Sequence, residues 1–168
     1  GPNSFSSSSQ NPTIGSVATL NAGTYSVTAT VAGCTGPAGT TVVIINSPPG
    51  VPTAGNNSPV CSGQTLSLTA SNIASATYSW TGPNSFSSSL QNPTIGSVTT
   101  LASGTYSVAV TVAGCTGSNG TVSVLVSPPV AAPSALSNAP ICEGQPLFLT
   151  AGTIAGATYN WTGPNTYT

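Results

Sequence analysis

Apolar and polar side chains alternate along several short stretches of this chain, which is the pattern of half-buried β-strands. The apolar members of residues 23–31 and 65–70 share one face in each stretch: Tyr25, Val27, Ala29 and Val31 in the first, and Leu66, Leu68 and Ala70 in the second. Nineteen Gly and fifteen Pro residues separate the stretches, and Pro ends a strand because it cannot donate to the ladder. The pattern predicts an all-β fold: a Greek-key β-sandwich of about seven strands in about 80 residues.

The same landmarks return at a fixed distance along the chain. Four pairs differ by 81 positions (161 − 80 = 81): Trp80 and Trp161, Tyr25 and Tyr106, Cys34 and Cys115, and Cys61 and Cys142. A fixed period is the signature of a tandem repeat. The period predicts the C-terminal half of one sandwich in residues 1–49, a complete sandwich in residues 50–130, and the N-terminal half of another in residues 131–168.

The chain starts after one tryptophan-bearing stretch and stops after another. Residues 131–168 would supply opening strands and residues 1–49 closing strands, so the two halves together would complete one more sandwich. This completion could occur within a continuous repeat array or by strand complementation between separate chains. No signal peptide is visible, and we expect the sequence to be a segment of a longer protein.

Charged side chains are almost absent from the 168 residues. The chain has no Lys, Arg or His and one acidic residue, Glu143, whereas about a quarter of an ordinary domain is charged. Without cationic side chains we expect no nucleic-acid partner, and oxygen ligands are too few for calcium. No apolar run approaches the roughly 20 residues of a membrane span. Because little charge repulsion keeps copies apart, we expect self-association, solubilising glycans, or both.

Catalytic and metal-binding patterns are also missing from the sequence. Glu143 has no acid or base partner, so the paired carboxylates of glycosidases cannot be assembled. Neighbouring cysteines lie 27 or 54 residues apart (61 − 34 and 115 − 61) and no His accompanies them, which is not a metal-ligand spacing. We therefore expect no metal, no cofactor and no enzymatic activity.

Three stretches together resemble the immunoglobulin pattern. They are residues 63–70 as strand B, Trp80 as the strand-C tryptophan, and residues 104–108, which hold the strand-F tyrosine corner. The cysteines of that family would fall at Ala70 and Val108, so the bridge between its sheets would be replaced by packed apolar side chains. The Cys-x-Gly opening and the Gly-Cys after strand F are more similar to the immunoglobulin-like or PKD-like tandem repeats of large bacterial surface and secreted, adhesin-like proteins.

This resemblance implies an extracellular, bacterial, secreted or cell-surface protein. We expect a segment of a filament, fibre or stalk whose immunoglobulin-like domains join head to tail, with further copies or repeats of itself as the partner. The alternative is an adhesin module that binds carbohydrate or another surface ligand, which would require exposed aromatic rings or a flat threonine array. The strand-C position favours core packing over sugar stacking for the tryptophans. The predicted core residues are Trp80, Trp161, Tyr25, Tyr106, Leu66, Leu68 and Val108.

The disulfide candidates are Cys34, Cys61, Cys115 and Cys142, because an oxidising location favours paired cysteines. One option pairs Cys61 with Cys115 inside a repeat and closes a loop worth about 4 kcal/mol. The other is a staple across a domain junction. In an immunoglobulin sandwich strands B and F run in the same direction, which would place these two sulfurs at opposite ends, whereas a disulfide needs Cα atoms within about 7 Å. Both options stay open.

Glycan acceptors are a further possibility in a secreted chain. Asn-x-Ser/Thr occurs at Asn56, Asn119 and Asn160, the last directly before Trp161. The serine runs at residues 6–9 and 85–89 could accept O-linked sugars or form polar strand edges.

Overall fold

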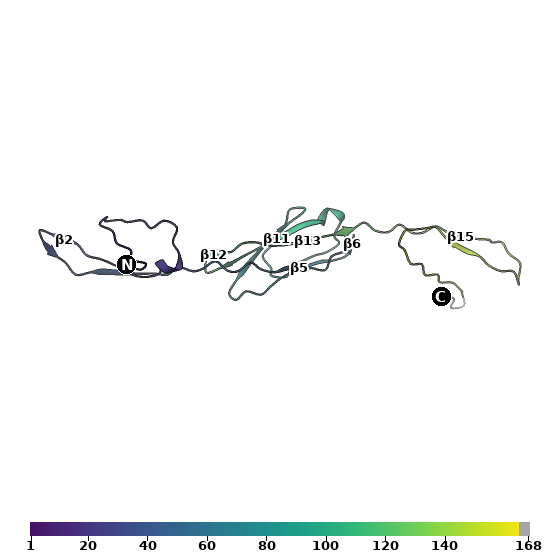
Figure 1. Ribbon diagram of the computed structural model, residues 1–168. Coiled ribbons are helices and arrows are strands. Elements are labelled where there is room, and N and C mark those ends of the chain that lie inside the picture. Colours follow the sequence, from purple (N-terminus) through teal and green to yellow (C-terminus); the bar gives the residue numbers. More distant parts are fainter. Residues whose placement is uncertain (165–168) are drawn as a thin grey trace. The chain divides into compact units, whose positions relative to one another are not determined.

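The computed structural model describes residues 1–164, which contain β-strands and two short 3-10 turns (Figure 1). The chain divides into two compact units, Gly1–Pro128 and Pro129–Thr168. No helix among the described residues is long and apolar enough to cross a membrane. The domain boundaries predicted after residues 49 and 130 stay predictions.

Residues 54–127 form a β-sandwich from two sheets. The first sheet has the order β10 (Thr94–Ile95), β7 (Leu66–Ala70), β5 (Ala54–Asn56). The second has the order β9 (Phe86–Ser88), β8 (Thr77–Gly82), β11 (Gly104–Val112), and two further strands pair with β11: β12 (Cys115–Thr116) and β13 (Gly120–Val124). Every pair within these sheets is antiparallel.

The chain passes back and forth between the two sheets of the sandwich. After β5 and β7 it crosses to β8 and β9, returns for β10, and crosses again through the 3-10 turn η2 (Thr100–Ala102) to β11. Beside these sheets, β6 (Val60–Cys61) pairs in parallel with β14 (Val126–Ser127). Antiparallel sheets with such Greek-key crossings make the sandwich immunoglobulin-like.

The core lies between the two sheets and follows the alternation of the sequence. Successive side chains of a strand point to opposite faces, so β7 buries Leu66, Leu68 and Ala70. The second sheet contributes the other large members of one cluster: Tyr78, Trp80, Tyr106, Val108, Val110 and Val124. Ala70 and Val108, the positions of the family's cysteines, are both buried apolar side chains.

Residues 1–49 form a long hairpin and a loop. The hairpin pairs β1 (Gly23–Val27) with β4 (Gly39–Val43), and its tip pairs β2 (Thr30–Val31) with β3 (Cys34–Thr35). The loop runs from the N terminus to the 3-10 turn η1 (Thr19–Asn21) on one side of the hairpin (Figure 1). No other strand of the described chain pairs with β1 or β4, so the outer edge of each of these two strands has no strand partner.

Residues 129–164 contain one two-stranded sheet. It pairs β15 (Ala135–Ser137) with β16 (Leu149–Ala151) in antiparallel register. The segment that bears Trp161 follows β16 and forms no strand within the described residues. Within the described residues, β15 and β16 are the strands of this unit.

Candidate functional site

The predicted core residues fall into a buried set and a half-buried set. Trp80, Tyr106, Leu66, Leu68 and Val108 are enclosed in the sandwich core. Tyr25 and Trp161 are only half-buried. We call two residues counterparts when they lie 81 positions apart in the sequence: Tyr25 is the counterpart of Tyr106, and Trp161 that of Trp80. The extent of burial therefore depends on the part of the chain in which the residue lies, and not on the residue type.

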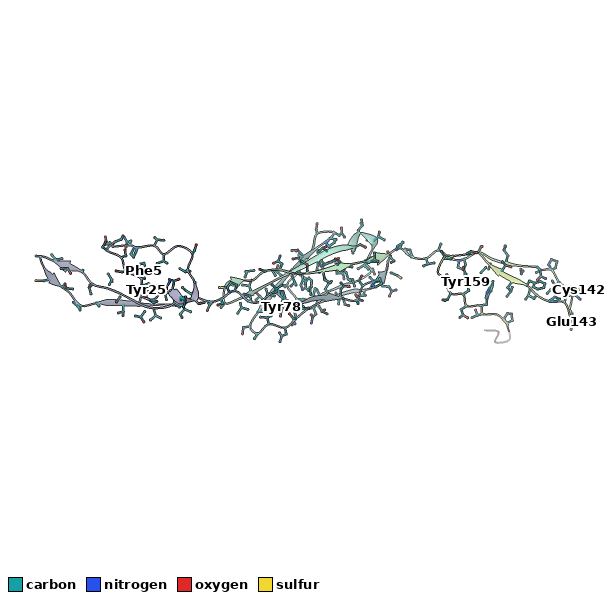
Figure 2. All side chains as sticks on the ribbon, in the orientation of Figure 1. Phe5, Tyr25, Tyr78, Cys142, Glu143 and Tyr159 are labelled. Carbon is teal, nitrogen blue, oxygen red and sulfur yellow. The ribbon has the colours of Figure 1, made fainter. Side chains whose placement is uncertain are left out.

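The two tyrosines make the same local contacts. The Tyr106 hydroxyl donates to the main-chain oxygen of Ala102 at 3.0 Å, and the Tyr25 hydroxyl donates to that of Asn21 at 2.8 Å. Burial raises the pKa of the Tyr106 phenol above its ordinary value, since an apolar surrounding disfavours the phenolate. Figure 2 shows Tyr25 beside Phe5; their ring centroids are 5.6 Å apart in an edge-to-face arrangement. The hydrogen bond of the tyrosine corner is therefore present in residues 1–49, although these residues do not form a sandwich.

Apolar side chains that the sandwich buries are exposed at their counterparts in the other two parts of the chain. Val108 is 0% exposed, whereas Val27 is 67% exposed. Leu66 and Leu68 are 0% and 1% exposed, whereas their counterparts Leu147 and Leu149 are 55% and 42% exposed. Exposed apolar patches of this kind mark interaction surfaces.

In residues 1–49, part of this apolar surface lines a hollow of about 580 Å³. One wall is formed by Phe5, Ser6 and Ser7 from the N-terminal loop, and the opposite wall by residues 25–27 of β1. Gln10 and Pro12 add to the lining. A smaller hollow of about 200 Å³ adjoins Ile14, Val17 and Ile45. Residues 39–41 of β4, the pairing partners of residues 25–27, line it as well, so the first hollow lies between the loop and the hairpin.

A second apolar hollow lies within residues 129–164. Leu147, Leu149 and Trp161 line a space of about 440 Å³ together with residues 162–164. Leu149 begins β16, Leu147 lies two residues before it, and Trp161 comes from the segment that follows the strand. Leu149 lies in β16, and within the described residues β16 pairs with β15 alone.

The cysteines have free thiols, and the structure places Cys61 and Cys115 far apart. Cys61 lies opposite Ser127 in the parallel β6–β14 pair, near the start of β11. Cys115 lies opposite Val112 at the end of β11, and its Sγ approaches the main-chain oxygen of Asn46 at 3.6 Å. The nine residues of β11 extend about 30 Å, whereas a disulfide needs Cα atoms within about 7 Å. These two thiols cannot pair inside one sandwich.

The remaining cysteines and the single carboxylate lie on the surface. Cys34 and Cys142 are exposed, and Glu143 adjoins Cys142 at a turn away from Tyr159 (Figure 2). Within residues 1–164, no three side chains of His, Cys, Asp or Glu gather as a metal site would require.

The three Asn-x-Ser/Thr sites differ in their surroundings. Asn56 is half-buried, and its amide donates to the Ser123 oxygen at 2.9 Å while its side-chain oxygen accepts from the Ser58 main-chain N–H. A glycan on Asn56 would disrupt these contacts. Asn119 and Asn160 are exposed, so their side chains are accessible to modification.

Sequence reasoning missed the hollow beside β1 and one close approach in the sandwich. A Cβ at Gly120 would collide with the main-chain oxygen of Pro52, which covers β13. The hollow had no direct signal in the sequence, because it depends on how the N-terminal loop lies against the hairpin. The Gly120 contact had no signal, because a glycine in a strand has several explanations.

No known protein family and no curated protein matches this chain. Among solved structures, it is similar to murine CEACAM1b, with 18% identity, 62% of this chain and 69% of that chain covered, and a TM-score of 0.43. It is also similar to a chain of the mouse coronavirus receptor-binding domain complexed with its murine receptor (16%, 52% and 59%, TM-score 0.40). A third is the amphioxus IgVJ-C2 molecule (20%, 65% and 63%, TM-score 0.37). The chain spans less than two thirds of the last two structures.

Proposed function

We propose that this chain is a structural segment of an extracellular filament, fibre or stalk built from tandem immunoglobulin-like domains with an 81-residue period. The domains join head to tail, and the location is the surface or surroundings of a bacterial cell. In this proposal the chain has a mechanical role and catalyses no reaction.

The observation that carries the proposal is the pair of incomplete apolar faces. Val27 and Leu149 are exposed where their counterparts Val108 and Leu68 are enclosed. Covering such surface is favourable by about 25 cal/mol for each Å² removed from water. A head-to-tail contact that covers both faces produces an open chain of subunits and no closed ring.

The nearly uncharged surface supports the same proposal. Soluble β-proteins keep their free strand edges apart with charged side chains, Lys above all, and this chain has no Lys or Arg. Charge repulsion therefore does not oppose contact between copies.

The alternative of a carbohydrate-binding adhesin has less support in the sandwich. Trp80, Tyr106 and Tyr78, its large aromatic side chains besides Phe86, are buried and cannot stack on a sugar. Phe148 and Tyr159 are exposed, but they lie in the incomplete residues 129–164 and not on the sandwich.

Electron microscopy of the purified 168-residue chain, together with sedimentation velocity, tests the proposal. We expect linear particles that lengthen with concentration and show one repeated domain. A single monomeric species across all concentrations would contradict the filament role.

A further inference from the structure

We propose that residues 46–52 form a strap that docks on the tip of the sandwich, and that this docking restricts movement between the sandwich and residues 1–45. The tip is residues 113–120, from the end of β11 to the first residue of β13. The strap forms no strand and spans the predicted domain boundary after residue 49. The inference goes beyond the proposed filament role, because it concerns contacts inside one chain and does not require copies to assemble.

The strap continues a side-by-side run of the segments that enter and leave the sandwich. β6 pairs in parallel with β14, and further toward the tip the Asn56 amide donates to the main-chain oxygen of Ser123 at 2.9 Å. At the tip itself the Asn46 amide donates to the main-chain oxygen of Ala113 at 3.4 Å. Both bonds join residues 67 positions apart. The strap therefore keeps the same alignment with the leaving segment before the first strand of the sandwich begins.

Two glycines of the tip let the main chain of the strap approach closely. A Cβ on Gly117 would collide with the main-chain oxygen of Pro49, and a Cβ on Gly120 would collide with that of Pro52. The side chain of Pro52 is fully buried, so this end of the strap is enclosed by the sandwich. Close approach of two backbones is one of the uses of glycine, and a larger residue at position 117 would push the strap away.

The strap also covers the thiol of Cys115. The Sγ atom donates to the main-chain oxygen of Asn46 at 3.6 Å, and the cysteine is half-buried. Its counterpart Cys34 holds the same position in the hairpin of residues 1–49 and is exposed. Cys34 therefore serves as an uncovered reference thiol inside the same molecule.

The composition of the strap lowers the entropy lost on docking. Three of its seven residues are proline, at positions 48, 49 and 52. A proline ring fixes its own φ at about −65°, and the residue before a proline prefers an extended backbone. Because the free strap already samples few conformations, holding it in one conformation costs less free energy than holding a flexible segment. A small number of contacts is then enough to keep it in place.

Docking changes the mechanical character of the joint. A flexible linker lets the parts that it connects move independently, whereas a strap held on the tip restricts that movement. In the proposed filament, the same contact at each junction would resist bending between successive domains.

Thiol labelling of the 168-residue chain tests the docking. Iodoacetamide is added, and the rates at Cys115 and Cys34 are followed by mass spectrometry of peptic peptides, each divided by its rate in the urea-unfolded chain. We expect Cys115 to react more slowly than Cys34 in the parent. Gly117→Ala should release the strap and raise the Cys115 rate about fivefold or more, with Cys34 unchanged. Equal rates at the two thiols of the parent would overturn the docking.

The matched control is Gly36→Ala. Gly36 is the counterpart of Gly117 and likewise lies two residues after a cysteine, but within 4 Å a Cβ there meets only the main-chain oxygen of Ala29, at 3.7 Å. We expect Gly36→Ala to leave the rate at Cys34 unchanged. If it raises that rate as much as Gly117→Ala raises the rate at Cys115, alanine acts on the hairpin itself and the strap has no part in it.

A change on the strap tests the same contact from the other side and leaves the tip intact. Asn46→Ala removes the donor to Ala113, whereas Ser47→Ala alters an exposed neighbour. We expect Asn46→Ala to raise the labelling rate at Cys115 and Ser47→Ala to leave it unchanged. Equal rates in these two variants would count against the strap.

Backbone order parameters of Gly50 and Val51 measure the freedom of the joint, by solution NMR or, if the chain forms fibres, by solid-state NMR. We expect about 0.85, the value of rigid backbone, in the parent and less than about 0.6 in Gly117→Ala. A value below about 0.6 in the parent would contradict the restricted joint.

The labelling result separates the strap from the filament role. A protected Cys115 in a chain that stays monomeric at all concentrations would support the strap and contradict the filament. Fibres from a chain whose Cys115 reacts as fast as Cys34 would do the reverse.

Discussion

At the scale of single residues, Trp80 shows how this chain stabilises its core without a disulfide. Its side chain is fully enclosed between the two sheets, and its indole N–H is paired with Gln91. The positions where immunoglobulin domains carry cysteines hold Ala70 and Val108, both buried. Apolar packing around the tryptophan therefore takes the place of the bridge, and the stability of the sandwich depends on it.

We expect Trp80→Ala to lower the free energy of unfolding of the sandwich by about 3–5 kcal/mol, since it removes a large enclosed side chain and leaves a cavity. Urea unfolding followed by far-ultraviolet circular dichroism measures the change. The control is Leu90→Ala, an exposed position in the same part of the chain, for which we expect a change within about 0.5 kcal/mol. Similar losses for both variants would show that Trp80 does not hold the core together.

Tyr106 gives the sandwich a dependence on alkaline pH. Its pKa is raised in the folded state from the ordinary 10.0, so below pH 10 the phenol is protonated in both states and contributes no pH dependence. Above that pH the unfolded chain releases the proton while the folded chain retains it. We expect the free energy of unfolding to fall as pH rises above about 10, and Tyr106→Phe to reduce that slope. An unchanged slope in the phenylalanine variant would assign the effect to other groups.

At the scale of elements, the length of a strand depends on its neighbours. Strand β11 runs without a break from Gly104 to Val112, and β8 pairs along residues 107–111. The counterpart stretch in residues 23–31 has two strands, β1 and β2, with a gap at residues 28–29. Residues 28–29 are the counterparts of residues 109–110, which pair with β8 in the sandwich. No strand of residues 1–49 pairs with residues 28–29.

The close contact of Gly120 with Pro52 gives a test at this scale. A methyl group on Gly120 would collide with the main-chain oxygen of Pro52, and backbone cannot move aside as cheaply as a side chain. We expect Gly120→Ala to destabilise the sandwich by about 1–3 kcal/mol, measured by thermal unfolding. Gly39→Ala, at the counterpart position with ordinary contacts, is the control; a drop of the same size there would mean that alanine in the strand, and not the collision, is responsible.

At the scale of the whole molecule, the lack of charge bears on the proposed contact between copies. With no Lys, Arg or His and one acidic side chain, the proposed assembly would depend on apolar burial and main-chain hydrogen bonds. Neither depends strongly on ionic strength, unlike attractions between exposed charges.

We therefore expect assembly to be unchanged between pH 5 and 8, because no His is present to titrate in that range, and between roughly 0.01 and 1 M sodium chloride. Light scattering across a pH and salt grid measures this. The variants Thr24→Asp and Thr150→Asp serve as a comparison, since added carboxylates bring a salt dependence. Dissociation of the parent assemblies at moderate salt would contradict an apolar contact.

For residues 54–127 the sequence by itself predicted the alternating strands and the core side chains, whereas Tyr25 and Trp161, predicted as core in the same way, are only half-buried. Strict alternation at Leu66, Leu68 and Val108 leaves one way for each strand to face, because a shift by one residue would expose the whole apolar set. Only the tertiary structure decided that Cys61 and Cys115 lie at opposite ends of the sandwich, that Pro52 covers Gly120, and that a hollow separates residues 5–7 from β1. These features join residues distant in the chain, and local alternation carries no information about such distances.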